Sequence, residues 1–321
     1  MSKKKKIQKI VTLIVTLAVA GLLFSSSIWY ISTTFQWGKI LPVLKAVEPT
    51  WLLLASGSVI FYWIVRTVRW HLLLYQLGVS IPFIDLYMCS AVGLAFAIIT
   101  PFQSGEMLKV ELLKKYGKID RFAGYSSFVV ERVADLVAVS LLAPVGLLCI
   151  PVFEIDFFSG LIVVLIILLA TSVGTLLTWK LNLPGALGRF QTDLRSCVKD
   201  LKTLGIVALL TFTCWGITAA GWYACLASVG VDVGYVKTML MTAIISLLNI
   251  LSLVPGAVGV SEAGISLFLI HLGFPAPLAQ AGAFILRGYS IIIIALGALH
   301  LLLWQRAWPN QYRAQRRRKT Q

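Results

Sequence analysis

Five stretches of this chain are free of charged side chains over about the length of a membrane-spanning helix; they are residues 11–35, 136–153, 157–179, 203–231 and 288–305. A helix of about 20 residues crosses the roughly 30 Å hydrocarbon core of a bilayer. A membrane barrel would alternate apolar and polar residues instead. Hydrophobic residues make up 59 % of the 321 positions, too many for a water-soluble surface. The sequence therefore predicts an all-α, polytopic membrane helix bundle, with residues 1–321 forming one transmembrane domain.

The positive charges are concentrated at membrane-flanking positions. The formal net charge is +15, and the Lys and Arg residues cluster in the segments 3–9, 109–121, 180–202 and 313–319. Cationic residues beside apolar helices are typical of the cytoplasmic side, where they contact anionic headgroups. Both termini, with the basic tails 1–9 and 305–321, are therefore predicted to be cytoplasmic, in the inner membrane. Nucleic acid is not an expected partner, because no nucleic-acid-binding motif accompanies the charge.

With both termini on the cytoplasmic side, the chain must cross the membrane an even number of times. The sequence predicts six full crossings and two re-entrant hairpins. An amphipathic basic stretch at 183–203 is predicted to lie on the cytoplasmic surface. The full crossings are predicted at residues 10–31, 50–75, 122–150, 158–180, 204–229 and 277–304.

The first re-entrant hairpin is predicted over residues 83–116. An apolar run begins on the cytoplasmic side, and the lysines that follow it, from Lys109 to Lys118, belong on the same side. The run therefore turns back, and Pro101 and Gly105 mark the break because proline and glycine interrupt helices. Its polar tip must lie within protein or face a wet cavity, since lipid cannot satisfy exposed backbone groups.

A second broken segment, residues 237–262, repeats this pattern and is predicted to re-enter from the opposite side. Its break residues are Pro255, Gly256 and Gly259. The Pro-x-x-x-Gly spacing is the same as in the first break. The second segment is therefore predicted to be the structural counterpart of the first.

An arginine follows each break at nearly the same distance along the chain. Arg132 follows Pro101, and Arg287 follows Pro255, at offsets that differ by a single position. Three crossings separate the hairpins, so the halves 50–150 and 204–304 are predicted to be inverted repeats in the membrane. Paired interrupted helices in opposed halves indicate a transporter's binding site.

Nine charged residues near the breaks are the candidate substrate-binding residues. Each charge costs about 2.5–3.5 kcal/mol at the bilayer centre, so these side chains need a wet or ion-paired environment. Arginine suits a phosphate headgroup because a guanidinium donates two parallel hydrogen bonds. Helix starts after Gly105 and Gly259 are expected to add backbone N–H donors. The candidates are Arg66, Arg69, Glu106, Lys109, Glu131, Arg132, Asp135, Glu262 and Arg287.

The arginines among these residues are predicted to line one cavity for an anionic or zwitterionic lipid headgroup, bound between the two halves. The carboxylates either pair with them or receive a cationic group. In an alternative interpretation the charged residues are anchors at the membrane interface. The uncharged runs that follow Asp135 and Arg287, at 136–153 and 288–304, are long enough for most of a crossing without them. Five tryptophans near crossing ends are assigned to the interfacial aromatic belt; they are Trp29, Trp37, Trp51, Trp304 and Trp308.

No motif in the sequence indicates an enzyme. The P-loop, the dinucleotide-binding glycine motif and the zinc-protease and serine-hydrolase motifs are missing. The five cysteines form no C-x-x-C pair and the three histidines are scattered, so no metal, cofactor or disulfide is expected. One alternative is a membrane-embedded lipid-modifying transferase, with Glu106, Glu131 or Asp135 as general base. Another is a non-catalytic partner of a separate lipid-synthesising enzyme.

Four blocks of sequence point to one known family. They are Arg66-x-x-Arg69-Trp70, Pro101-x-x-x-Gly105-Glu106, Glu131-Arg132-x-x-Asp135-Leu136 and Pro255-Gly256-x-x-Gly259-x-x-Glu262-Ala263-Gly264. Over nearly the whole chain, the sequence resembles the lysylphosphatidylglycerol synthase transmembrane family, whose flippase-like module also occurs as stand-alone membrane proteins.

In fused bacterial members of that family, the membrane module moves an aminoacylated phospholipid across the bilayer and a separate soluble domain makes the lipid. The resemblance therefore implies translocation or handling of a lipid with a charged headgroup, without the synthase activity. The expected partners are membrane lipids and, in the last alternative above, a lipid-synthesising enzyme. The sequence carries no signal for the oligomeric state.

Overall fold

The computed structural model is helical throughout the part of the chain that it describes. The described residues are 31–115, 118–149, 184–251 and 254–319, with 21, 25–26, 28–29, 161–162, 165–166, 169, 172–173 and 180. No strand occurs among them, which confirms the all-α prediction. The predicted crossing at 158–180 and most of the one at 10–31 lie outside the described residues.

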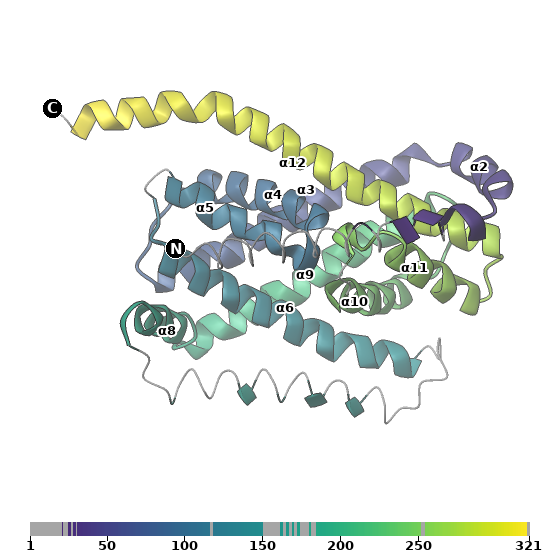
Figure 1. Ribbon diagram of the computed structural model, residues 1–321, viewed down its shortest axis with the longest axis horizontal. Helices are drawn as coiled ribbons and strands as arrows, with labels where there is room; N and C mark the ends of the chain where they lie inside the picture. Colours follow the sequence, from purple (N-terminus) through teal and green to yellow (C-terminus); the bar gives the residue numbers. More distant parts are fainter. Residues whose placement is uncertain are drawn as a thin grey trace, which may run out of the picture.

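Three of the described helices are long and apolar enough to cross a membrane. Their bounds lie close to those of three predicted crossings, and α12 runs along the whole bundle (Figure 1). The protein is therefore a polytopic membrane protein. The helices are α3 (Pro49–Gln76), α9 (Leu201–Ala227) and the Ala276–Trp304 part of α12 (Ala276–Lys319).

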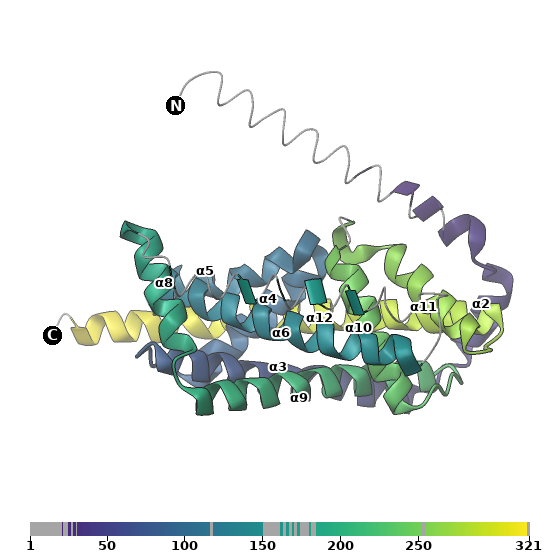
Figure 2. The same ribbon diagram turned by 90° about the horizontal axis from the view of Figure 1, so that it is seen from below.

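Helices α3 and α9 pack side by side in opposite directions (Figure 2). The Gln76 amide at the end of α3 donates to Thr203 Oγ1 at the start of α9 over 2.7 Å. At the other end, the rings of Trp51 and Tyr223 meet edge to face with centroids 6.1 Å apart. Asp200 fixes the start of α9, because its carboxylate accepts hydrogen bonds from backbone N–H groups of the first turn.

The first broken segment consists of α4 (Phe83–Ile99), the 3₁₀ helix η1 (Pro101–Met107) and α5 (Leu108–Lys115). Proline at the first position of η1 has no N–H to continue α4, which explains the break that the sequence predicts. Helix α5 folds back along α4. Lys118, after α5, donates to the Asp85 carboxylate in the first turn of α4, so the two ends of this segment lie together.

Gly105 is required by close packing at this break. A Cβ at that position would lie 2.5 Å from Phe96 O and 2.7 Å from Thr100 Oγ1. We expect Gly105→Ala to destabilise the protein by about 1–3 kcal/mol, because the backbone must move to admit the methyl group. Thermal unfolding in detergent measures this effect.

Gly288→Ala is the matched control for that variant. No heavy atom lies within 4 Å of a Cβ at Gly288, which is inside α12. This change is expected to be neutral or to stabilise by up to about 1 kcal/mol, since alanine favours helix. Equal unfolding temperatures for the two variants would show that the η1 backbone is not held tightly.

The second broken segment consists of α10 (Tyr235–Leu251), the 3₁₀ helix η2 (Pro255–Ala257) and α11 (Val260–His271). Its backbone reverses through left-handed conformations: φ is +63° at Gly256, +49° at Ala257 and +85° at Gly259. The two glycines adopt these angles without a steric penalty. The predicted break residues therefore lie where the helix is interrupted.

The tips of the two broken segments meet inside the bundle. The carbonyl oxygen of Ile98, at the end of α4, lies 3.2 Å from the position that a Cβ of Gly256 would occupy. In Figure 1, α4 and α5 fill one half of the molecule, and α10 and α11 fill the other half. Helix α6 (Arg121–Cys149) packs against α10 and also contacts α5, so it touches both broken segments.

Three features differ from the sequence-based expectation. Helix α2 (Trp37–Lys45) was not predicted; it is too short to give a long apolar run, and it packs on α12 through Ile40. The predicted amphipathic stretch is divided into α8 (Gly185–Cys197) and the start of α9, because Asp200 caps a new helix. Trp304 is 4 % exposed and belongs to the same buried cluster as Trp70, so it does not face the surrounding lipid as a residue of an aromatic belt would.

Candidate functional site

Seven of the nine candidate residues form one buried ion-pair network at the first break. They come from α3, η1, α5 and α6. Arg66 and Arg69 lie three residues apart on one face of α3, and Glu131 and Asp135 lie four apart on one face of α6, so each helix directs both of its charged side chains the same way. We call this cluster the buried network. Its members are Arg66, Arg69, Glu106, Lys109, Glu131, Arg132 and Asp135.

Arg66 joins η1 to α6. Its Nη2 donates to both carboxylate oxygens of Glu106, at 2.9 and 3.0 Å, and to Asp135 Oδ2 at 3.2 Å. Its Nη1 donates to the Tyr62 hydroxyl at 2.6 Å, one turn earlier on α3. Arg66 and Glu106 are 4 % and 0 % exposed, so this contact is made entirely within protein.

Arg69 joins α3, α6 and α9. Its Nη1 donates to Asp135 Oδ1 at 2.6 Å and to Thr211 Oγ1 at 2.8 Å, and Nη2 donates to Asp135 Oδ2 at 3.2 Å. Its Nε donates to Glu131 Oε1 at 3.4 Å. The planar guanidinium therefore spans both carboxylates on the same face of α6.

Lys109 links η1 to α6 within the buried network. Its ammonium group donates to Glu106 Oε1 at 2.9 Å and to the Glu131 carboxylate. The same nitrogen lies 4.5 Å from the centroid of the Trp70 ring, a favourable position for a cation. Lys109 is only 1 % exposed, so it is enclosed by protein, whereas Lys115 later in the same helix is exposed.

Arg132 is the member of the buried network that reaches toward the second break. Its Nη2 contacts Glu106 Oε2 at 2.8 Å and Asp135 Oδ2 at 2.7 Å, while Nη1 donates to Gln103 Oε1 at 3.1 Å. Its side chain is 27 % exposed. Gln103 has a φ of +54°, a conformation that non-glycine residues rarely adopt, so its position is imposed by the surroundings.

The buried network contains four cations and three carboxylates, and therefore one positive charge in excess when all are ionised. Removing one member of a buried pair is strongly destabilising, because a charge is then left without compensation. The interpretation of these residues as anchors at the membrane interface does not fit the fully buried members, because protein rather than headgroups surrounds them. These are Arg66, Arg69, Glu106, Lys109 and Glu131, with exposed fractions of 0–4 %.

The remaining two candidates, Glu262 and Arg287, form a separate pair at the second break. Arg287 Nε donates to Glu262 Oε1, Nη1 donates to Gly256 O at 3.0 Å, and Nη2 donates to Ala257 O at 3.5 Å. Glu262 Oε2 accepts the backbone N–H of Gly259 at 2.8 Å. The pair thus satisfies backbone groups that the interrupted helix cannot pair itself.

The backbone amides of the two break glycines, Gly105 and Gly259, are already paired within the protein. Gly105 N–H donates to Thr100 Oγ1 at 2.7 Å, and Gly259 N–H donates to Glu262. These two glycine amides are therefore not open to an anion, whereas the donors expected at the helix starts that follow them stay a prediction. A threonine and a glutamate of the chain itself occupy the position that a ligand oxygen would take.

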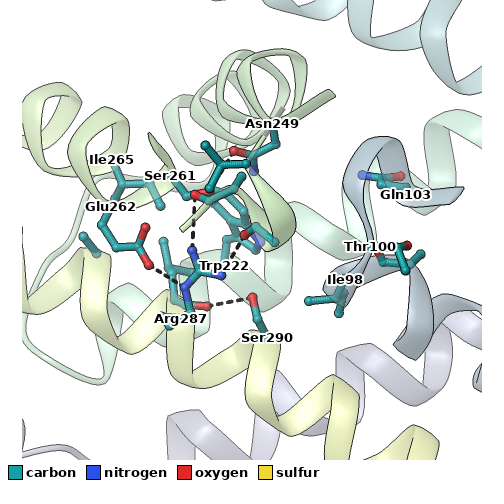
Figure 3. A pocket seen from close by; sticks show the side chains of 16 residues that line it. Ile98, Thr100, Gln103, Trp222, Asn249, Ser261, Glu262, Ile265, Arg287 and Ser290 are labelled. Atoms are coloured by element: carbon teal, nitrogen blue, oxygen red, sulfur yellow. Dashed lines mark hydrogen bonds and ion pairs between the residues drawn. The ribbon is translucent and has the colours of Figure 1, made fainter. Parts of the chain in front are cut away.

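A cavity of about 130 Å³ lies beside the point where the two breaks meet and is lined by residues of both. Ile98, Thr100 and Gln103 face it from the first break, as Figure 3 shows. Opposite them lie residues from α10, α11 and α12: Asn249, Ser261, Glu262, Arg287 and Ser290. We call this space the polar cavity.

The structure corrects the predicted cavity lined by all four arginines. Arg287 lines the polar cavity, whereas Arg66 and Arg69 are enclosed in the buried network. The physical reason is that the carboxylates of η1 and α6 reach these two arginines directly, so no space is left for a ligand between them. Arg132 reaches the polar cavity through Gln103.

Two amide side chains in the polar cavity were not among the predicted site residues. Ser261 donates to Asn249 Oδ1 at 2.7 Å, and Arg132 donates to Gln103 Oε1. Because each amide oxygen already accepts a bond, each NH₂ group is the part left to donate to a ligand. The signal for Asn249 was present in the sequence, since it is the one amide side chain in the apolar run 237–253.

Outside the membrane-spanning helices, Glu111 ties α5 to the start of α6. Arg121 donates to both of its carboxylate oxygens, at 3.0 and 2.9 Å, and the Tyr125 hydroxyl donates at 2.7 Å. These hydrogen bonds, that of Arg121 first, lower the pKa of Glu111 to about 2. Glu111 is therefore ionised at physiological pH and holds the end of the hairpin in place.

The fold and the site define a polytopic, all-α membrane protein that holds charged side chains inside an apolar helix bundle. The described residues contain no group of three or more His, Cys, Asp or Glu side chains that could hold a metal ion. The sequence model of the family described as "Lysylphosphatidylglycerol synthase TM region" matches residues 13–297. The chain belongs to this family.

Similar proteins occur in methanogenic archaea. Two described as "UPF0104 membrane protein", both from Methanothermobacter thermautotrophicus, are 23 % identical over 312 residues and 22 % identical over 284 residues. These matches cover 86 % and 77 % of this chain, and 91 % and 81 % of the relatives. A further UPF0104 membrane protein, from Methanocaldococcus jannaschii, is 31 % identical over 99 residues, which is 30 % of each chain.

Proposed function

We propose that this protein binds a lipid with a charged headgroup inside the bilayer and moves it between the two leaflets. The observation that carries the proposal is the polar cavity. It lies between two broken helices, within a bundle of apolar membrane helices, and an arginine and two amide groups face it. Membership of the family supports the same conclusion, because the resemblance implies translocation of a phospholipid.

The donors around the polar cavity favour a phosphate-like group. The NH₂ groups of Asn249 and Gln103 face it, and so does the guanidinium of Arg287. Both carboxylate oxygens of Glu262 already accept hydrogen bonds from the protein. The cavity therefore presents more donors than open acceptors, which suits an anionic or zwitterionic headgroup.

We also propose that the two broken segments are re-entrant and belong to inverted repeats, with both termini cytoplasmic. Two observations support this arrangement. Each break is followed by an arginine that pairs with the carboxylate near its own glycine, Arg132 with Glu106 and Arg287 with Glu262. The two tips also meet in the middle of the bundle, as expected for hairpins that enter from opposite sides.

Cysteine labelling tests this topology. In a background without the native cysteines, a cysteine at position 112 is expected to react with a membrane-impermeant reagent from the cytoplasmic side only. A cysteine at position 273, between α11 and α12, is expected to react from the outside only. Exposure of both positions on the same side would exclude opposed hairpins.

Reconstitution tests the function itself. Liposomes containing the purified protein and fluorescent lipids that differ only in headgroup are compared with protein-free liposomes. Phosphatidylglycerol or its aminoacylated form is expected to move between leaflets faster than a diacylglycerol with the same chains, because the donors in the polar cavity need a charged headgroup. Equal rates for charged and neutral lipids would remove the polar cavity from the mechanism.

A further inference from the structure

A second cavity lies against the same Glu262–Arg287 pair. It has a volume of about 280 Å³, and both charged residues line it. Its other walls are formed by the segment before α2, by Val258 after η2, and by Phe284 of α12. We call it the apolar groove. The polar cavity and the apolar groove therefore share one ion pair as a common wall.

The apolar groove is built by contacts between the N-terminal part of the chain and α12. The backbone N–H of Gln36 donates to Gln280 Oε1 at 2.9 Å, and the rings of Trp37 and Phe284 meet edge to face with centroids 4.9 Å apart. Ile28, also in its wall, is 48 % exposed. The groove is thus held by defined contacts and opens at the outer surface of the bundle.

We propose that the polar cavity and the apolar groove together bind one phospholipid, with its phosphate in the polar cavity and an acyl chain in the apolar groove. This inference rests on the proposed function and assigns the lipid to a particular place. An amphiphile is the class of ligand that has a charged part next to an apolar part. Two cavities of these two kinds, with one ion pair in the walls of both, match that chemistry.

Arg287 is placed to contact such a lipid from both cavities. Its side chain is 21 % exposed, whereas Glu262 beside it is 4 % exposed. Its hydrogen bond to Ala257 O is long, at 3.5 Å, so Nη2 gives up little when it turns to a phosphate oxygen. The polar cavity holds several times the roughly 30 Å³ that one water occupies in the liquid, enough for a compact charged group.

Two neighbouring residues provide a matched pair of variants for the apolar groove. Ser32 lines the groove; Thr33 is not among its lining residues, and both are exposed. Each donates its hydroxyl hydrogen to Trp29 O at 2.8 Å, so the two lose the same local bond on substitution. Ser32→Trp fills the groove, and Thr33→Trp adds the same bulk beside it. Asn249→Leu removes an amide donor from the polar cavity.

The measurement is retention of defined lipids by the full-length protein, detected by native mass spectrometry after exchange into detergent. The probes are a two-chain phosphatidylglycerol, a diacylglycerol with the same chains, and inorganic phosphate. Ser32→Trp is expected to lower phosphatidylglycerol retention at least about tenfold, equivalent to about 1.4 kcal/mol. Thr33→Trp is expected to leave it unchanged. Asn249→Leu is expected to lower retention of phosphatidylglycerol and not of diacylglycerol.

Several results would overturn the two-part site. Unchanged phosphatidylglycerol retention in Ser32→Trp would show that no acyl chain lies in the groove. Inorganic phosphate bound as tightly as phosphatidylglycerol would assign the polar cavity to a free anion. Cross-links from position 32 to a co-purifying protein would assign the groove to a protein partner.

The translocation assay distinguishes failure of this site from failure of the proposed function. Full lipid movement by Ser32→Trp, with unchanged retention, would overturn the two-part site and leave the proposed function standing. Headgroup-selective retention by the unaltered protein without any lipid movement would have the opposite meaning: the site would be correct and the translocation proposal wrong.

Discussion

Replacing Arg69 with alanine is expected to destabilise the folded protein by about 3–5 kcal/mol, the usual effect of breaking a buried charge pair. Arg69 is completely buried, and its guanidinium contacts Asp135 through two nitrogens and Glu131 through a third. Removing it leaves two carboxylates of α6 with fewer cations, and it leaves the Thr211 hydroxyl without this donor. Unfolding in detergent, followed by loss of helical signal, measures the change.

Two further variants separate the loss of charge from the loss of geometry. Arg69→Lys keeps the positive charge but cannot reach both carboxylates with a planar fork, so it is expected to recover only part of the lost stability. Arg189→Ala removes an arginine that is exposed on α8 and is expected to change stability by less than about 0.5 kcal/mol. If Arg69→Ala were as stable as Arg189→Ala, the buried network would not support the fold.

The helix breaks could be predicted from the sequence because their cause is local. A proline removes a backbone donor wherever it stands, and glycine alone accepts a φ of +63° or +85° without a steric penalty, as at Gly256 and Gly259. The long membrane crossings could also be predicted from the sequence, since they follow from hydropathy and length. Helix α2 was missed because a short amphipathic helix gives neither signal.

The pairing of the charges could not be predicted, because it depends on contacts between distant parts of the chain. Arg69 and Asp135 are 66 positions apart, and nothing in the local sequence tells which carboxylate an arginine on α3 meets. From the sequence we predicted charged residues near the breaks, and we predicted that four arginines line one cavity. The structure divides them into a closed network and a separate pair that faces open space.

This division suggests different roles for the two groups. The enclosed members of the buried network, such as Lys109, make their ion pairs within the protein and line neither cavity, so their effect on a lipid is indirect. Arg287 and Glu262 line cavities, and Arg132 reaches one of them through the Gln103 side chain. Arg132 is therefore the link between the charge of the network and the place where we propose that a headgroup binds.

Arg132→Ala is expected to slow the movement of anionic lipids at least about tenfold, equivalent to about 1.4 kcal/mol in the barrier, while membrane insertion stays intact. Three effects act together. The buried network loses its excess positive charge, the Gln103 amide loses the donor that fixes its oxygen, and the polar cavity loses a nearby cation. The partners that remain explain why the fold survives: Glu106 keeps Arg66 and Lys109.

The distinguishing measurement is the ratio of translocation rates for phosphatidylglycerol and diacylglycerol, taken on protein with an unchanged unfolding temperature. Arg132→Lys restores the charge without the paired donors and is expected to give an intermediate ratio. Gln103→Leu keeps the charge of the network and removes only the amide in the polar cavity. A loss of rate in this variant therefore reports the hydrogen bond that orients the headgroup, and not the attraction by the charge of Arg132. If Arg132→Ala moved phosphatidylglycerol at the full rate, the buried network would serve the fold alone, and the recognition of charge would have to reside in Arg287 and its neighbours.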